Sequence, residues 1–327
     1  MLSFITQRLC ESLVVLLIMS FITYGLMGLM PGDPIDLMIQ ANPGLGPNDA
    51  FRLKAIYGLD QPIIARYSAW LSDALSGDFG FSRLYNQPVF DILWPRLLDT
   101  LKLMIPAFLI AVAISIPLGI MAALKPYSII DYTINLVSFS GISIPSFWLA
   151  LLAIIYFSIN LGWFPASGNA EVGASFWDSL RYMVLPICVL VVTSIGSFIR
   201  FMRAAMIETL RQDYVRTARA KGVSEYRLLT HHCLQNALIP LITVIALSFG
   251  SLFSGTLIIE TIFSWPGMGK MIYDSILGND YNLAMVGFLL ATVMTIAGNL
   301  LADIGYAIAD PRVQLSKQND EGATDYE

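Results

Sequence analysis

Charged and small side chains alternate between positions 213 and 225, where the chain reads Asp-Tyr-Val-Arg-Thr-Ala-Arg-Ala-Lys-Gly-Val-Ser-Glu. The residues before Gly222 favour a short helix, and Gly222 suits the positive φ angle at which helices commonly end. Ser224 and Glu225 suit the first turn of a second helix. Two short helices with a rigid break carry out no covalent chemistry, but they can transmit a push from a soluble partner. A basic surface hairpin that only binds anionic lipid is the alternative.

Two other segments contain residue types that bind metals or nucleotides, but neither has the required pattern. His231, His232 and Cys233 are adjacent, and neighbouring side chains on a helix diverge by about 100°, so they do not converge on one ion. Gly269 and Lys270 are followed by Met271, so the phosphate-binding pattern G-x-x-x-x-G-K-S/T is not completed there or elsewhere in the chain. We therefore expect no metal site and no cofactor in this chain.

The elements that carry these segments are expected to cross a membrane. Of the 327 residues, 56% are hydrophobic and 13% are charged, whereas a soluble domain has about 25% charged residues. A helix that crosses the hydrocarbon core needs about 20 mostly apolar residues. Six runs have that length, at 12–30, 103–124, 134–160, 182–200, 238–259 and 283–308. The sequence therefore predicts an all-α integral membrane protein with about six transmembrane helices, and its net charge of −5 gives no sign of nucleic-acid binding.

Lysine and arginine positions predict how the chain is oriented. Segment 200–236 has seven basic residues, whereas 162–181 and 261–282 have only Arg181 and Lys270. Short cytoplasmic loops are enriched in Lys and Arg, so we expect segment 200–236 in the cytoplasm. With six spans, both termini are then cytoplasmic.

The spans also predict a division of the chain. Residues 1–30 form the cytoplasmic N-terminus and first span, and residues 31–100 form a small external cap with an amphipathic helix at 63–75. Residues 101–312 form the membrane core, which includes the cytoplasmic loop 203–236. The polar, acidic tail 313–327 is expected to be disordered.

The interiors of expected spans two to five contain no Asp, Glu, Lys or Arg. Ion-coupled carriers usually place ionisable residues within the membrane, and here only Glu11, Glu260 and Asp303 approach it, all near span ends. An ion-coupled secondary transporter is therefore the less favoured alternative. An enzyme embedded in the membrane would need a polar catalytic group in a span, and we find no convincing nucleophile–base or metal pair, so we expect no enzymatic activity.

Seven short motifs follow one another in the order seen in one transporter family. They are Pro31-Gly32-Asp33-Pro34, Gly58-Leu59-Asp60-Gln61-Pro62, Gly77-Asp78-Phe79-Gly80, Ile144-Pro145-Ser146-Phe147, Thr217-Ala218-Arg219-Ala220-Lys221-Gly222, Glu260-Thr261-Ile262-Phe263-Ser264-Trp265-Pro266-Gly267-Met268-Gly269 and Asp310-Pro311-Arg312. The chain thus resembles the binding-protein-dependent ABC importer permeases of the oligopeptide/dipeptide family, in particular the first of their two permeases. The resemblance covers nearly the whole chain up to Arg312.

The resemblance implies a type I ABC importer permease fold and a place in the bacterial inner membrane. It implies a pore shared with a second, homologous permease, two cytoplasmic ATPase subunits that bind ATP and magnesium, and an external solute-binding protein. The expected ATPase-coupling residues are Arg216, Thr217, Ala218, Arg219, Lys221, Gly222 and Val223. Peptides are the leading substrate class, with nickel complexes, glutathione, polyamines, sugars and opines as alternatives.

A second expected site lies on the external side. Pro266, Gly267 and Gly269 enforce a tight turn of the chain near the mouth of the pore. We hypothesise that Glu260 and Trp265 help to form an outer gate there.

Overall fold

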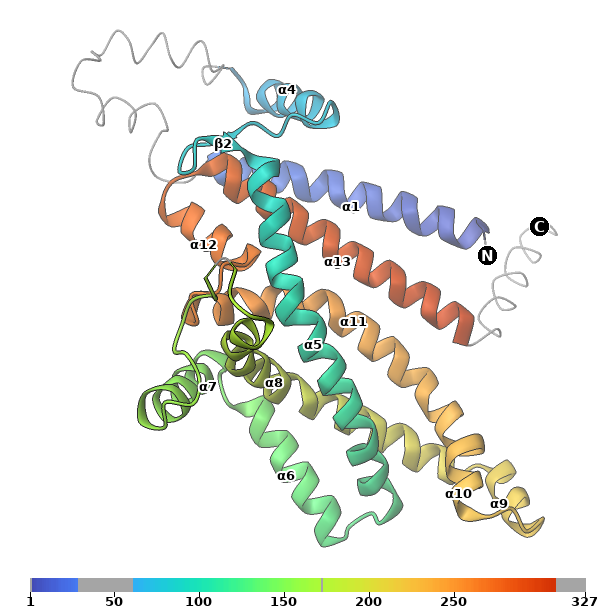
Figure 1. Cartoon of the computed structure of the whole chain (residues 1–327). Coiled ribbons are helices and arrows are strands. Elements are labelled where there is room, and N and C mark those ends of the chain that lie inside the picture. The colour runs from blue at the N-terminus through green and yellow to red at the C-terminus, as the bar shows by residue number, and fades with distance from the viewer. Residues whose placement is uncertain (1, 29–60, 172, 310–327) are drawn as a thin grey trace, which may run out of the picture.

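The computed structural model describes residues 2–28, 61–171 and 173–309. Five long helices dominate it, and they lie side by side in Figure 1. They are α1 (Leu2–Gly28), α5 (Val89–Leu124), α8 (Phe176–Leu210), α11 (Leu234–Ile262) and α13 (Tyr281–Ala309). The motifs at 31–34 and 310–312, most of the motif at 58–62 and the expected disordered tail lie outside the described residues.

Several of these helices are long and apolar enough to cross a membrane. Within the described residues, four pass on length and composition, and a bent pair of shorter helices raises the number to five. The expected fifth span lies within α11, some of whose side chains are outside the described set. The total of six spans therefore stays a prediction.

The expected third span, 134–160, is not one straight helix, and the prediction was wrong on this point. It consists of α6 (Ile129–Ser143), α7 (Ser146–Ala153) and a π-helical continuation, η1 (Ile154–Asn160), with a bend of 98° between the two halves. Proline disfavours the helical conformation of the residue before it. Ile144, which precedes Pro145, accordingly has an extended backbone with ψ of 124°.

Two other helices extend well beyond their apolar runs. Helix α5 begins at Val89 rather than near 103, so the last part of the expected external segment is helical. Helix α8 begins at Phe176, after Ser175, whose hydroxyl accepts a hydrogen bond from the Asp178 amide at 3.2 Å. The length of an apolar run reflects the thickness of the hydrocarbon core, whereas the start of a helix depends on its first turn and its cap. An apolar run therefore does not predict where the helix begins.

Short elements cover one end of the long helices. The predicted amphipathic helix is confirmed as α4 (Ile63–Leu75), whose Tyr67 hydroxyl lies 2.6 Å from the Ser20 hydroxyl of α1. Strands β1 (Phe81–Ser82) and β2 (Gln87–Pro88) form an antiparallel hairpin, and α12 (Met268–Leu277) precedes α13. The buried Asp280 joins them, because it accepts hydrogen bonds from the Ser82 hydroxyl at 2.5 Å and from the Leu84 amide at 3.0 Å.

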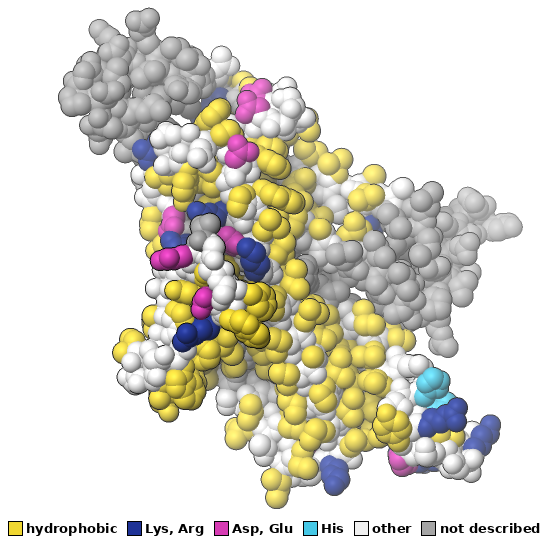
Figure 2. Space-filling view, in the orientation of Figure 1, with side chains coloured by type: hydrophobic (Ala, Val, Ile, Leu, Met, Phe, Trp, Pro, Cys, Tyr) yellow, Lys and Arg dark blue, Asp and Glu magenta, His cyan; other side chains and the backbone are white. Residues whose placement is uncertain are grey.

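The surface has the polarity of a membrane protein. Figure 2 shows hydrophobic side chains over the middle of the molecule, with Lys and Arg both on the left side, beside Asp and Glu, and at the lower right end, where the His side chains also lie. That end carries the short helices α9 (Asp213–Ala220) and α10 (Glu225–Arg227), while α4 and α12 lie toward the opposite end in Figure 1. Large apolar side chains such as Leu136 remain 69% exposed, as expected for contacts with lipid or with another membrane subunit.

Candidate functional site

The segment at 213–225 has the predicted helix, break and second helix. After α9, Gly222 has φ of 77°. Its amide donates to the Arg219 carbonyl at 3.0 Å, and the Val223 amide donates to the Ala218 carbonyl at 3.2 Å. These two bonds form a Schellman motif, which satisfies carbonyls at the end of a helix. The predicted positive φ of Gly222 at the end of the helix is therefore confirmed.

The second helix differs from the expectation in its cap. Ser224 occupies the N-cap position, but its side chain makes no capping hydrogen bond. Helix α10 then continues through a π-helical segment, η2 (Leu228–Cys233), directly into α11. Because no break separates these three elements, α9 is joined through one short turn to a continuous helical rod.

An ion pair closes that turn. The Arg219 guanidinium donates two hydrogen bonds to the Glu225 carboxylate, at 2.7 and 3.1 Å. The pair lowers the pKa of Glu225 below its ordinary value and raises that of Arg219. A carboxylate with a lowered pKa stabilises the fold above its ordinary pKa, and the stabilisation is lost as the pH falls through the folded-state value. The pair is therefore intact at neutral pH.

Helix α9 has one buried face and one exposed face. Val215 is fully buried, and Ala218 and Val223 pack against the same cluster, which contains Met202, Met206, Leu228 and Cys233. Arg216, Thr217 and Lys221 are exposed. Ala218, one of the expected coupling residues, is partly buried by its contact with this cluster.

The residues of the expected outer gate form a buried bracket between α5, α11 and α12. Glu260 is fully buried and accepts hydrogen bonds from the Thr100 hydroxyl at 2.7 Å and the Lys270 amide at 3.0 Å. The Trp265 indole donates to the Asp99 carbonyl at 2.9 Å. A side chain at Gly267 would overlap the Glu260 carboxylate, and one at Gly269 would crowd the Leu257 backbone at 2.5 Å.

The bracket extends to Pro266, whose carbonyl accepts a hydrogen bond from Arg96 at 3.0 Å. The five expected gate residues are thus brought together, but Glu260 and Trp265 point into the protein rather than into open space. Sequence reasoning missed their partners on α5, namely Arg96, Asp99 and Thr100. These lie 160 to 170 positions away in the chain, and no local pattern connects residues so far apart.

The adjacent histidines show no metal-binding geometry. The rings of His231 and His232 are 6.0 Å apart and nearly perpendicular, and Cys233 is buried in the cluster beneath α9. In the part of the chain that the structure describes, no three His, Cys, Asp or Glu side chains are grouped so that they could hold a metal ion.

Comparison with known proteins defines the class. Residues 115–315 match the family described as binding-protein-dependent transport system inner membrane component, and residues 1–104 match the N-terminal region of such membrane components. The chain belongs to this family. It is therefore a permease subunit of an ABC importer and a multi-pass inner-membrane protein; the ATPase of such importers is a separate subunit, so the chain is not itself an enzyme.

Individual relatives match over nearly their whole length. The oligopeptide transport system permease protein AppB of Bacillus subtilis is 40% identical, over 96% of this chain and 100% of the relative. The di/tripeptide transport system permease protein DppB of Pseudomonas aeruginosa is 36% identical, over 96% and 99%. These matches support the importer class over the ion-coupled alternative.

A solved structure supports the fold independently. A chain of the inward-facing MetNI methionine ABC transporter superposes with a TM-score of 0.56 at 16% identity, over 68% of this chain and 97% of that chain. The type I permease fold implied by the sequence is thereby confirmed.

Proposed function

We propose that this permease imports peptides, as one half of a pore that it shares with a second, homologous permease. The observation that carries the proposal is the near full-length match to relatives named for oligopeptide and di/tripeptide transport. The uncharged interiors of expected spans two to five support it, because a pore without fixed charges accommodates variable side chains better than it selects ions.

Two ATPase subunits are proposed to dock on the exposed face of α9. Arg216, Thr217 and Lys221 form this face. The Schellman motif and the Arg219–Glu225 pair hold α9 against the rod of α10, η2 and α11. A short helix held in this way moves as a unit with the rod, which is what a coupling element requires. We infer that loop 203–236 lies in the cytoplasm, and, with the expected six spans, that both termini do too.

The buried bracket is proposed to support the outer gate on the opposite side. It fixes the turn at 263–267 to α5 and α11 through the Glu260 and Trp265 contacts. The external binding protein would deliver its substrate at this end. Glu260 then acts by holding the gate elements together, not by contacting the substrate.

Uptake into proteoliposomes tests the function. The permease is purified with its sister permease, ATPases and binding protein, and radiolabelled trialanine is supplied outside with ATP inside. We expect uptake that requires ATP and the binding protein, and that persists when an ionophore collapses ion gradients. Uptake driven by a proton or sodium gradient without ATP would contradict the proposal. Mass spectrometry of the ligand carried by the binding protein decides between peptides and the other substrate classes.

A further inference from the structure

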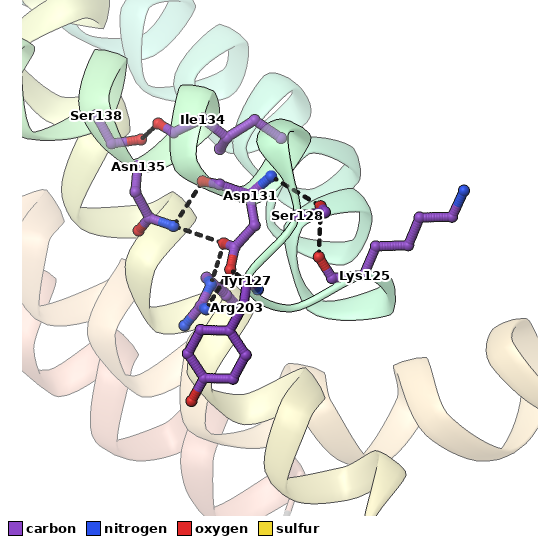
Figure 3. Close-up of polar contacts among 8 residues, drawn as sticks. All are labelled: Lys125, Tyr127, Ser128, Asp131, Ile134, Asn135, Ser138 and Arg203. Atoms are coloured by element: carbon purple, nitrogen blue, oxygen red, sulfur yellow. Dashed lines mark hydrogen bonds and ion pairs between the residues drawn. The ribbon is translucent and has the colours of Figure 1, made fainter.

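A buried ion pair joins the first half of the broken span to α8. Asp131, in the first turn of α6, is 2% exposed. Both of its carboxylate oxygens accept hydrogen bonds from the Arg203 guanidinium, each at 2.6 Å. The Asn135 amide and the Tyr127 backbone amide also donate to this carboxylate, at 2.6 and 2.8 Å. Figure 3 shows these donors converging on Asp131 from three sides.

Between this ion pair and the bend at Pro145, the backbones of α6 and α8 lie in close contact. A side chain at Gly196 of α8 would overlap the Ser138 carbonyl of α6. One at Gly141 of α6 would lie 2.7 Å from the Val192 carbonyl of α8. The two helices are therefore antiparallel neighbours, packed through glycines in the middle and fixed by the ion pair near their cytoplasmic ends.

This helix pair connects the coupling loop with the break in the membrane. Arg203 lies two turns before the end of α8 at Leu210, and α9 follows after only two residues. Helix α6 ends at Ser143, immediately before the 98° bend at Ile144 and Pro145. Movement of α9 thus reaches α8 directly, but it reaches α6 and the bend only through contacts between helices.

We propose that the Asp131–Arg203 pair is the positioning contact that transfers movement of the coupling helix to the broken span α6–α7. The proposal rests on the coupling role of α9 given above. The geometry is suited to this role, because a bidentate guanidinium–carboxylate pair fixes orientation as well as distance. The glycine contacts alone are non-directional packing, which allows the helices to slide along each other.

The test measures trialanine transported per ATP hydrolysed, in proteoliposomes that contain the complete importer. Asp131→Asn and Arg203→Gln each remove one charge, and the double variant removes both. Arg203→Lys keeps the charge and loses the bidentate geometry, and it is the milder variant if the others assemble poorly. Arg8→Gln is the control, since it removes an exposed ion pair with Glu11 in α1, away from both candidate sites.

We expect the transport-to-hydrolysis ratio of assembled complexes to fall at least tenfold in Asp131→Asn and in Arg203→Gln. The double variant should lose no more than either single variant, because the same contact is removed. Arg8→Gln should keep the wild-type ratio. If the variants only reduce the amount of assembled complex and leave the ratio unchanged, the pair is merely structural and the proposal is overturned. Failure of the ATPases to bind the wild-type permease would instead refute the coupling role of α9.

Discussion

At the scale of single residues, Gly222 shows how a backbone angle can limit function. Its φ of 77° lies in the left-handed region, yet no atom lies within 4 Å of the place a Cβ would occupy. The constraint is therefore conformational rather than steric. L-residues lose about 1–2 kcal/mol in this region, and Asn tolerates it better than others.

We predict that Gly222→Val abolishes or strongly reduces trialanine uptake, while Gly222→Asn retains it within about twofold. A β-branched residue at this position should distort the Schellman motif and move the exposed face of α9. Both variants should still insert and pair with the sister permease, because the change lies outside the spans. Uptake and co-purification of the ATPases are measured in the same membranes. Wild-type uptake by Gly222→Val would refute the assignment of the coupling helix.

Glu260 leads to a second prediction at this scale. Its carboxylate accepts hydrogen bonds from Thr100 and from backbone amides at the start of α12. Gln has only one accepting oxygen in its side chain, so Glu260→Gln should leave a buried donor unpaired, at a cost of about 1–3 kcal/mol. We expect a lower melting temperature in detergent, which the exposed control Glu11→Gln should not show.

Glu260→Gln, together with Trp265→Ala, also tests the proposed role of the bracket in the outer gate. Glu260→Gln and Trp265→Ala should weaken the stimulation of ATP hydrolysis by the binding protein, because both loosen the bracket at the external end. Unchanged transport and unchanged stimulation in both variants would show that the bracket has no role in gating.

At the scale of elements, the sequence predicted the places of the long helices better than their lengths and bends. Apolar runs located α8 and α13, but α5 begins 14 positions before its predicted span, because Asp91, Arg96 and Asp99 interrupt the apolar residues of its first turns. Pro145 was visible, yet prolines inside membrane helices are often tolerated. Whether such a proline kinks or breaks a helix depends on packing, here the close contact of α6 with α8.

The candidate site shows the same limit. The break at Gly222 was predictable, because a helix end is encoded by adjacent residues. The contacts of Glu260 with Thr100 and of Asp131 with Arg203 were not, since they join positions 160 and 72 residues apart. Asp131 also lies outside the third expected span, three positions before that span begins.

Close helix packing gives a prediction at this scale. Gly196→Ala would place a methyl group against the Ser138 carbonyl, and backbone atoms cannot rotate away as a side chain can. We expect α6 to be displaced from α8 and the protein to be destabilised by about 1–3 kcal/mol. The matched control is Gly25→Ala in α1, whose added methyl would meet only Ile63, at 3.9 Å. Thermal unfolding of the purified proteins compares the two, and equal melting temperatures would contradict the close contact.

At the scale of the whole molecule, the two candidate sites lie at opposite ends of the helices (Figure 1). Helix α5 has 36 residues, and at 1.5 Å per residue it is about 54 Å long, well beyond the hydrocarbon core of about 30 Å. The 14 residues of α5 that precede its apolar run at 103–124 are therefore expected to extend beyond the hydrocarbon core at the end that carries the bracket. Under the proposed orientation, the bracket lies outside and loop 203–236 lies in the cytoplasm, so that ATP hydrolysis would act at one end of the helices and substrate would enter at the other.

Cysteine labelling tests this orientation directly. Single cysteines are placed at Ser76, Asn169, Ser224 and Leu277, which are exposed in the structure. Leu277 is preferred over the neighbouring Asn279, which is only partly exposed and has φ of 53°. The background replaces the exposed Cys10 and Cys188, while the buried Cys233 remains.

A membrane-impermeant maleimide added from outside should label positions 76, 169 and 277, and should label 224 only after the membrane is permeabilised. A single cysteine in place of Leu136, on the apolar surface of α6, should not react with the reagent from either side. External labelling of position 224 would show that the proposed orientation is inverted. The ATPases could then not be placed on α9.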